Sequence, residues 1–548
     1  TPASLYGSDA VAGVVQLVTR RPDFDSADTG VAGDVYAAYE TVDDARRIGG
    51  TVDTGSARWH ASVSGEYLRT GDRRIGGGET VSPSGFEARA LRAAFGFQPQ
   101  QGGEWLFDLH YYEQPETPRV DELVPGFGET EPASSEFFFA PNRRMYANAR
   151  HQREEGLAGL DWTVSFAWQR VDDDRRTRDF NADERRFETN RSDLYGLLVT
   201  AGDSDEAGSW IAGAELYYDT VSSGRRAENI VTGTTVALTP RFPDGSEVLQ
   251  GSLFGSLSRE VTQRMTLSGG LRYSEVEVRL PATIASRATT VSSGDLAGDL
   301  GAIVRFADNW QWTTNIGIGF RAPNVFDLGT LGNRPGNRFN IPNTSLGSEH
   351  VVQLDTGVRF NATGLQFEFV AYGLRFDDRI TSVDTGAVTP GWRDVVQSVN
   401  AARSDIVGIE SGVIVALTDA VSLRGVLNYT RGEQRIDAGA DEPADRIPPL
   451  GGLLEVLYDD RGAWQATAWL RYADRQPRLS ARDIRDSRID PDGTPGWAIL
   501  GGRLTWLPRP AWSVSLTLDN LLGRRYRVHG SGIDAPGRNV ALQVRRRF

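Results

Sequence analysis

The sequence contains no cysteine, which excludes disulfide frameworks, thiolate metal sites and cysteine nucleophiles. It also contains no lysine, so all 59 basic residues are arginine. A GC-rich coding bias accounts for this better than a demand for bidentate anion binding, which would not remove every lysine. The net charge of −14 argues against a nucleic-acid partner. No run of about 18 consecutive apolar residues occurs, so a transmembrane helix is excluded.

The dominant pattern is alternation of apolar and polar residues with a period of two, which is typical of strands whose faces meet different surroundings. In residues 310–321, Ile316 and Ile318 fall on one face and Asn315 on the other. Only every second residue of a membrane barrel faces lipid, which reconciles a membrane location with a mean hydropathy of −0.37. We therefore expect Ile316 and Ile318 to face lipid and Asn315 to face the interior. The same pattern recurs at 161–169 and 512–519.

The connections between the strands form a second regularity, because short turns alternate with mostly longer loops. The short turns fall near residues 55, 100, 155, 205, 260, 308, 361, 419, 460 and 510. A tight connection near residue 43 opens the series, and longer ones follow at 71–83, 115–142, 172–183, 222–246, 280–290, 321–348, 378–394, 432–447, 474–496 and 522–537. Outer-membrane barrels combine short periplasmic turns with long extracellular loops. The sequence therefore predicts an all-β fold, a 22-stranded antiparallel transmembrane β-barrel.

Tryptophan gives an independent indication of the same fold. Most of the 13 tryptophans lie within a few residues of a proposed short turn, among them Trp59, Trp105, Trp162 and Trp512. Indole rings favour the headgroup level of a bilayer, where barrels carry aromatic girdles, whereas tryptophans of a soluble core would scatter along the strands. The clustering favours a membrane barrel.

Several segments resemble, in the same order, segments of the TonB-dependent outer-membrane receptor family. Residues 1–22 (TPASLYGSDAVAGVVQLVTRRP) look like the end of the family's plug domain, and residues 319–328 (GFRAPNVFDL) look like its FRAP segment. Residues 346–360 resemble its L-x-P-E…E-x-G stretch, with Ser348 where proline is usual. The other matches are residues 398–413, the RIPPLGGLLEV segment at 446–456 and residues 518–548.

The resemblance implies an outer-membrane barrel whose lumen is occluded by an N-terminal plug. We expect residues 1–22 to be the C-terminal remnant of that plug and residues 23–548 to be the barrel, so that this chain lacks the TonB box and most of the plug. The family imports scarce, large ligands, most often ferric siderophores, with energy from the TonB–ExbB–ExbD complex acting on the N-terminus. Further expected partners are outer-membrane lipid, lipopolysaccharide and, through the C-terminal Phe548, the barrel assembly machinery.

Aromatic and arginine residues in the longest predicted loops are the candidate ligand contacts. Residues 136–146 (EFFFAPNRRMY) place three phenylalanines near two arginines, and the loop after the FRAP segment adds further arginines. Rings and guanidinium groups suit an anionic, aromatic ferric chelate through stacking and charge-assisted hydrogen bonds. Packing of the loops on themselves and contacts with lipid phosphates are the alternatives for each residue. The candidates are Phe137, Phe138, Phe139, Arg143, Arg144, Arg321, Arg334, Arg338 and Phe339.

Other functions find little support in the residues. The five histidines are far apart without HxxxH spacing, and no G-x-S-x-G segment occurs, so we expect no catalytic residue, no metal site and no enzymatic activity. The acidic run at 172–174 could hold Ca²⁺, but a solvated loop explains it better.

The expected ligand is a ferric siderophore-type chelate, and no covalently bound cofactor is expected. Haem receptors of the family usually carry a histidine in the loop that corresponds to residues 324–345, and here the nearest histidine is His350. The alternatives are a haem or cobalamin receptor, or a non-energised passive pore or surface-binding barrel.

Overall fold

The computed structural model describes residues 7, 14, 18–22, 24, 28–99, 102–284, 286–334, 338–389, 393–436 and 439–548, with only the backbone path at residues 157, 333 and 334. The segment 1–22, interpreted above as the end of a plug, lies largely outside the described residues. No helix in the described part of the chain is long and apolar enough to cross a membrane.

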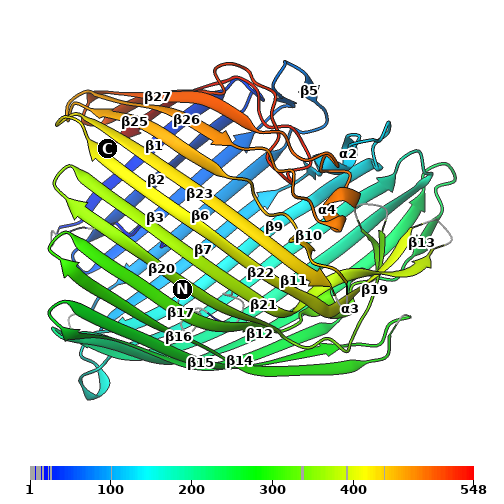
Figure 1. Cartoon of the computed structure of the whole chain (residues 1–548), viewed down its shortest axis with the longest axis horizontal. Helices are drawn as coiled ribbons and strands as arrows, with labels where there is room; N and C mark the ends of the chain where they lie inside the picture. Colours follow the sequence, from blue (N-terminus) through cyan, green and yellow to red (C-terminus); the bar gives the residue numbers. More distant parts are fainter. Residues whose placement is uncertain are drawn as a thin grey trace.

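The fold is a closed barrel of 22 antiparallel strands, each hydrogen-bonded to its neighbours in the wall (Figure 1). It closes because the first strand, β1 (Gly30–Glu40), pairs with the last, β29 (Asn539–Arg547). Reciprocal backbone hydrogen bonds of 2.9 and 3.0 Å between Gly33 and Phe548 complete this seam. Closure leaves no open strand edge, whose polar groups lipid could not satisfy. The predicted 22-stranded all-β barrel is confirmed.

The remaining strands of the wall follow in chain order. They are β2 (Arg46–Ser56), β3 (Trp59–Arg69), β6 (Glu87–Phe97), β7 (Glu104–Gln114), β9 (Ser134–Arg153), β10 (Asp161–Asp179), β11 (Glu184–Asp205), β12 (Gly208–Asn229), β14 (Ser246–Thr262), β15 (Met265–Leu280), β16 (Thr289–Ala307), β17 (Trp310–Arg321), β20 (Glu349–Ala362), β21 (Leu365–Val388), β22 (Asp394–Ala416), β23 (Val421–Ile436), β25 (Gly451–Asp459), β26 (Trp464–Ala473), β27 (Trp497–Arg509) and β28 (Trp512–Asp519).

Short strands and helices occupy the connections between the wall strands. The short strands are β4 (Arg73–Arg74), β5 (Thr80–Val81), β8 (Thr117–Pro118), β13 (Thr235–Ala237), β18 (Gly332–Arg334), β19 (Arg338–Ile341) and β24 (Glu442–Pro443). The helices are α2 (Val120–Leu123), α3 (Val325–Gly329), α4 (Ala481–Arg485) and the 3-10 turn η1 (Leu157–Gly159).

The period-two alternation separates the outer face of the wall from the inner face. On β17, Ile316 and Ile318 are each 47% exposed and point outward, as predicted, because no second protein layer covers the outside of the barrel. On the inner face, Arg272 of β15 is 1% exposed and forms an ion pair with Glu215 of β12. An apolar exterior around a polar interior is the arrangement of a membrane barrel.

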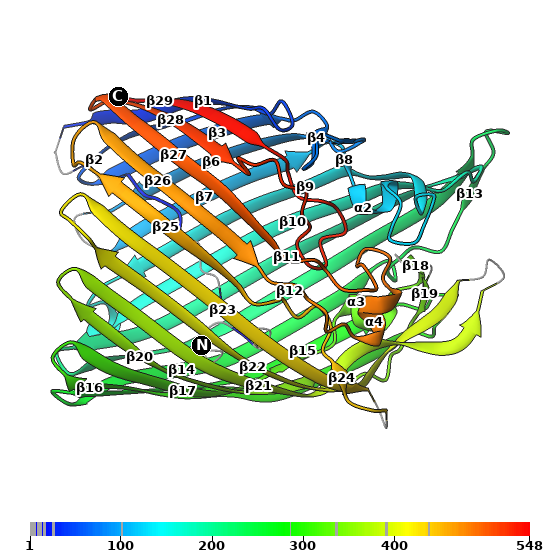
Figure 2. The ribbon, with the colours of Figure 1, turned by 45° about the horizontal axis from the view of Figure 1, so that its top comes forward.

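The two ends of the barrel differ (Figure 2). At one end, called the turn end, short turns join consecutive strands, for example at 57–58, 206–207, 308–309 and 510–511. At the other, called the loop end, the longer connections carry α2, α3, α4 and β13. The predicted alternation of short turns and longer loops is confirmed.

Several predicted loops are shorter than expected, because the strands continue beyond the apolar band. The polar composition of these strand extensions had indicated loops. Cross-strand ion pairs, such as those of Glu136 with Arg178 (2.9 Å) and Arg185 (2.7 Å), stabilise the strand pairing there without apolar alternation. The residues that prove to be strand rather than loop are 134–142, 172–179, 222–229, 378–388 and 432–436.

The loop between β17 and β20 folds back onto the inner wall. Val325 and Leu328 of α3 belong to a buried apolar cluster with Val278 and Leu280 of β15 and with Phe320. A capping box at Asn324 starts α3, which fixes the direction in which the chain enters the cluster. The FRAP-like segment is therefore held against the wall at the loop end.

Candidate functional site

Arg143 and Arg144, predicted to lie in a loop, lie on β9 and point to opposite faces of the wall. Arg144 points inward, where its Nε donates to the Gln169 side chain (2.8 Å) and its guanidinium lies 5.7 Å from the centre of the Tyr146 ring. Arg143 points outward and forms an ion pair of 3.0 Å with Asp172 of β10. Only Arg144 can therefore meet a ligand that enters the barrel.

The three phenylalanines of β9 are divided in the same way. The register places Phe137 and Phe139 opposite residues of the inner face of β10 and Phe138 opposite Arg176 of the outer face. The rings of Phe137 and Phe139 are 6.0 Å apart, and Arg119 lies 5.1 Å from the Phe137 ring. Phe137 is buried. The inner face thus presents Phe139 and Arg144, with Phe137 packed behind them.

Arg321, at the end of β17, is held by two carboxylates. It forms ion pairs with Asp327 of α3 (2.7 Å) and with Glu349 of β20 (2.8 Å). Glu349 also accepts a hydrogen bond of 2.5 Å from the backbone N–H of Ile380. Arg321 therefore connects α3 of the FRAP-like segment to β20 of the wall, and its charge is balanced by these two acids. Its contact with a ligand stays a prediction.

Arg338 lies in a pocket of about 260 Å³ at the loop end. Burial and the nearby charge of Arg482 lower the pKa of Arg338. Phe339, the next residue of β19, is half-buried and pairs with Val395 of β22. The side chain of Arg334 lies outside the described residues. The pocket is lined by Arg338, Ser382, Asp384, Asp394, Val396, Arg482, Arg485 and Asp486.

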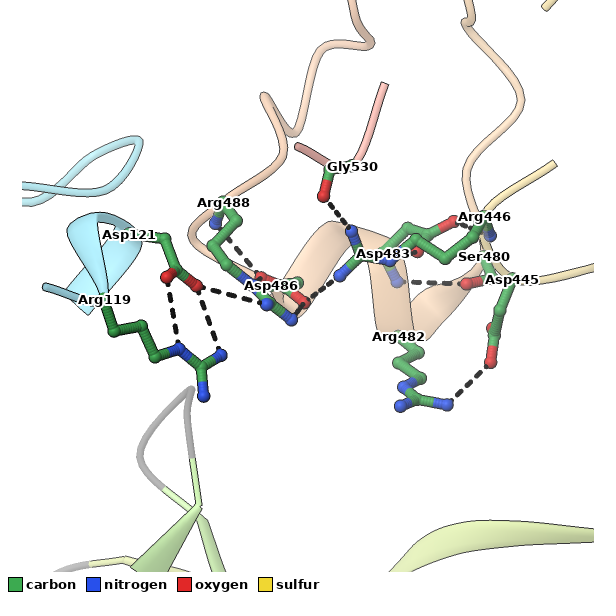
Figure 3. A network of polar contacts seen from close by, with 10 residues as sticks. All are labelled: Arg119, Asp121, Asp445, Arg446, Ser480, Arg482, Asp483, Asp486, Arg488 and Gly530. Carbon is green, nitrogen blue, oxygen red and sulfur yellow. Dashed lines mark hydrogen bonds and ion pairs between the residues drawn. The ribbon is translucent and has the colours of Figure 1, made fainter. Parts of the chain in front are cut away.

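An electrostatic network joins four connections of the loop end (Figure 3). Arg488 donates to Asp486 from Nε (2.8 Å) and from Nη2 (2.8 Å), and it also reaches Asp121 (3.4 Å). Arg446 pairs with Asp486 and with Asp483 (3.3 Å), and its Nη1 donates to the carbonyl oxygen of Gly530 (2.9 Å). Since these residues come from the β7–β9, β23–β25, β26–β27 and β28–β29 connections, the network fixes the four connections to one another. We call it the loop network.

Two buried carboxylates of this region, Asp486 and Asp445, have lowered pKa values in spite of burial. Burial raises the pKa of Asp486, but the hydrogen bond and the charge of Arg488 outweigh it, so the net pKa is lowered. Burial also raises the pKa of Asp445, but a hydrogen bond with Ser480 and the charge of Arg482, which pairs with Asp445 at 3.1 Å, outweigh it and lower the net pKa. The network is therefore made of ion pairs at neutral pH.

One further ion pair crosses from one side of the barrel to another. Arg393, just before β22, pairs with Asp179 at the end of β10 (3.1 Å), and Asp179 also binds Arg186 (2.9 Å). Several wall strands separate the two partners, namely β11, β12, β14, β15, β16, β17, β20 and β21. Arg393 therefore pairs with a residue from which eight wall strands separate it around the barrel.

Sequence reasoning identified only some of the residues that gather at the loop end. It named Arg338 but not the loop network, although the dense alternation of aspartate and arginine in residues 482–488 was a visible signal. It interpreted residues 172–174 as a solvated loop, whereas they lie on β10, and Asp172 is buried between Arg143 and Arg191. In the part of the chain that the structure describes, no three histidine, aspartate or glutamate residues gather as a metal site would require.

Comparison with known proteins gives a consistent result. Residues 19–521 match the family model described as "TonB dependent receptor-like, beta-barrel". Among curated proteins, the chain is similar to the "Rhizobactin receptor" of Rhizobium meliloti (strain 1021), with 22% identity over 445 residues. That match covers 70% of this chain and 57% of the relative, so the chain spans little more than half of the relative's length.

Solved structures share the fold over almost the whole chain. The "Copper transporter OprC" superposes with a TM-score of 0.83 at 17% identity, covering 96% of this chain and 82% of that one. The "ferric yersiniabactin uptake receptor FyuA from Yersinia pestis" superposes with a TM-score of 0.75 at 16% identity, covering 100% and 84%. At such identities the likeness shows the architecture of the barrel.

Proposed function

Since the chain belongs to the TonB-dependent receptor family, whose members are transporters and not enzymes, we propose that it imports a ferric siderophore-type chelate across the outer membrane. The barrel is an integral protein of that membrane. The loop end is then extracellular and the turn end periplasmic. The ligand would enter at the loop end, where the inward-facing residues described above are first met.

The observation that carries the proposal is the chemistry of this opening. Arg144 and Phe139 face inward from β9. The pocket at the loop end adds three arginines beside three aspartates, namely Arg338, Arg482, Arg485, Asp384, Asp394 and Asp486. Guanidinium groups bind carboxylate or catecholate oxygens through charge-assisted hydrogen bonds, and the rings stack on an aromatic chelator. Arg144 and Phe139 suit a large chelate with anionic oxygens and aromatic rings better than they suit a bare cation.

Two further points support a chelate over haem. One relative is named a rhizobactin receptor, and the solved structures with this fold include a "ferric yersiniabactin uptake receptor" and the "siderophore receptor PirA from Acinetobacter baumannii". His350, the histidine nearest to the FRAP-like loop, is already bound to Asp295 at 2.7 Å. An axial ligand for haem iron would have to come from elsewhere.

The partners follow from the family and belong to the same proposal. Energy would come from the TonB–ExbB–ExbD complex acting on a segment upstream of the barrel, and residues 1–22 would be the last segment of a plug. Lipid and lipopolysaccharide would surround the outer face. The barrel assembly machinery would recognise the strand that ends at Phe548.

Iron uptake tests the proposal. The full-length gene would be expressed in an iron-limited strain without other receptors, and uptake of iron-labelled catecholate, hydroxamate and carboxylate chelates would be measured with and without TonB. We expect TonB-dependent uptake of at least one chelate. Uptake of none of them, or uptake that persists without TonB, would overturn the proposal.

A pair of adjacent substitutions tests the site. Arg144→Gln removes an inward guanidinium, so we expect the affinity for the transported chelate to fall roughly tenfold, the size of one lost charge-assisted hydrogen bond. Arg143→Gln is the matched control, because its side chain lies on the outer face. Equal effects of the two substitutions would contradict the assignment of Arg144 to the site.

A further inference from the structure

A row of charged residues crosses the outer face of the wall toward the extracellular end. Antiparallel pairing places Arg89 of β6 opposite Glu113 of β7, and Glu113 opposite Arg143 of β9. The row continues from Arg143 to Asp172 of β10 and to Arg191 of β11. Directly opposed residues of neighbouring strands point to the same face. Three arginines and two acids therefore share one line, with one excess positive charge.

The row lies just above the aromatic border of the apolar band. Four residues further along β11, about 13 Å at the usual rise, Tyr195 is 42% exposed and pairs with Trp168 of β10. Leu197 and Val199 follow on the same face. Because Tyr and Trp rings mark the membrane–water interface, Arg143 and Arg191 stand at the level of lipid headgroups.

Asp172 holds two of these arginines in a fixed geometry. Its side chain is only 3% exposed, and its two oxygens accept hydrogen bonds from the Nε atoms of Arg143 (3.0 Å) and Arg191 (2.9 Å). Both carboxylate bonds use Nε, so they do not occupy the terminal nitrogens of the two guanidinium groups. The Arg143 side chain also interacts with the hydroxyl group of Tyr111 on the same outer face. Among the described residues, the terminal nitrogens of Arg191 have no hydrogen-bond partner.

We propose that Arg143 and Arg191, oriented by Asp172, bind a phosphate group of a phosphorylated glycolipid in the outer leaflet, such as lipid A. A tetrahedral phosphate accepts several hydrogen bonds, and two guanidinium groups joined by one carboxylate offer paired donors and a net positive charge. The aromatic residues below the row would contact the acyl chains. The site extends the proposed lipid contact to named residues and does not depend on which chelate is imported.

Binding of labelled lipid A to the purified receptor tests the site. The full chain would be placed in nanodiscs of uncharged lipid and titrated with lipid A and with its dephosphorylated form. For the unsubstituted protein we expect roughly tenfold or more tighter binding of the phosphorylated form. Equal binding of the two forms would overturn the proposal, and this arm needs no variant to fold.

Variants then locate the phosphate contact. In R143Q/R191Q we expect the preference for phosphorylated lipid A to disappear, while R143K/R191K, which keeps the charge but not the forked donors, retains part of it. R144Q is the matched control, because the neighbouring side chain faces the lumen, and it should keep the full preference. Full preference in R143Q/R191Q would refute the assignment. Chelate uptake by the same variants separates a failure of this site from a failure of the proposed import.

Discussion

Arg143 and Arg144 are adjacent in the sequence but face lipid and lumen, respectively. The pairing register of β9 with its neighbours decides which face each side chain occupies. This register shifts by one residue near residues 140–141, so that Phe139 lies on the inner face together with Arg144. Composition alone cannot reveal such a shift, because one inserted residue exchanges the two faces of everything beyond it.

Substitutions at neighbouring positions of β17 test the assignment of faces. Ile316→Arg places a charge on the lipid face, so we expect the free energy of unfolding to fall by roughly 2–4 kcal/mol near the bilayer midplane. Asn315→Arg places the same side chain on the inner face, opposite Gly301 and Asp355, and should cost much less. Denaturant titration of the barrel refolded in lipid measures both. Similar losses for the two variants would contradict the outward orientation of Ile316.

The wall strands show how far the sequence predicts elements. Alternation identified the apolar parts of strands such as β10, β17 and β28, because lipid contacts only one face of each. The spacing of the short connections identified the turn end. The extensions of β9, β10, β12 and β21 were not predictable in this way. They lie beyond the apolar band, where ion pairs such as Glu136 with Arg178 replace apolar packing and leave no period-two signal.

The loop network should depend on pH. The pKa of Asp486 is lowered in the folded protein, so its ion pairs stabilise the loops above the ordinary value of 3.8, and this contribution is lost as pH falls through the lower folded value. We expect spin labels on the exposed residues Glu129 and Ile484 to give a narrow distance distribution at neutral pH and a broad one well below 3.8.

The Arg488→Gln variant provides the comparison for this experiment. It removes the cation that bonds Asp486 and reaches Asp121, so the distribution should already be broad at neutral pH. A narrow distribution in this variant at neutral pH would mean that the network does not hold the loops together.

The orientation of the barrel can be checked at single connections. We expect an epitope tag between Asp308 and Asn309, at a short turn, to be inaccessible on intact cells. A tag in the 230–234 turn of the β12–β14 connection should be labelled from outside. Labelling of the first tag on intact cells would reverse the assignment of the two ends.

Closure of the whole barrel depends on its last strand. Deletion of residues 539–548 leaves β1 and β28 with unpaired edges, so we expect no folded, protease-resistant barrel after refolding in lipid. Phe548→Ala keeps the ladder from Asp34 to Glu40 and should refold in vitro. If this variant assembles more slowly in cells but refolds normally in vitro, the result would support recognition of Phe548 by the assembly machinery. A folded barrel after the deletion would show that closure does not require β29.

The site at the loop end was less predictable than the fold, because it is assembled from distant parts of the molecule. Arg488 and Asp121 lie 367 positions apart, and Arg393 and Asp179 lie 214 positions apart. Sequence reasoning could select arginines and aromatic residues as candidates. It could not say that Arg321 is matched by two acids or that Arg143 faces the membrane, since both facts follow from the closed wall.

The length of β11 and β12 has a consequence for how the cell surface is recognised. Each contains 22 residues, whereas about 9–11 suffice to cross a bilayer, so roughly half of this hairpin is a paired sheet in the aqueous phase. An antibody or a phage tail fibre meets there a stiff surface whose epitopes combine side chains from neighbouring strands. Antisera raised against linear peptides of this region would therefore bind the denatured chain and miss the protein on living cells.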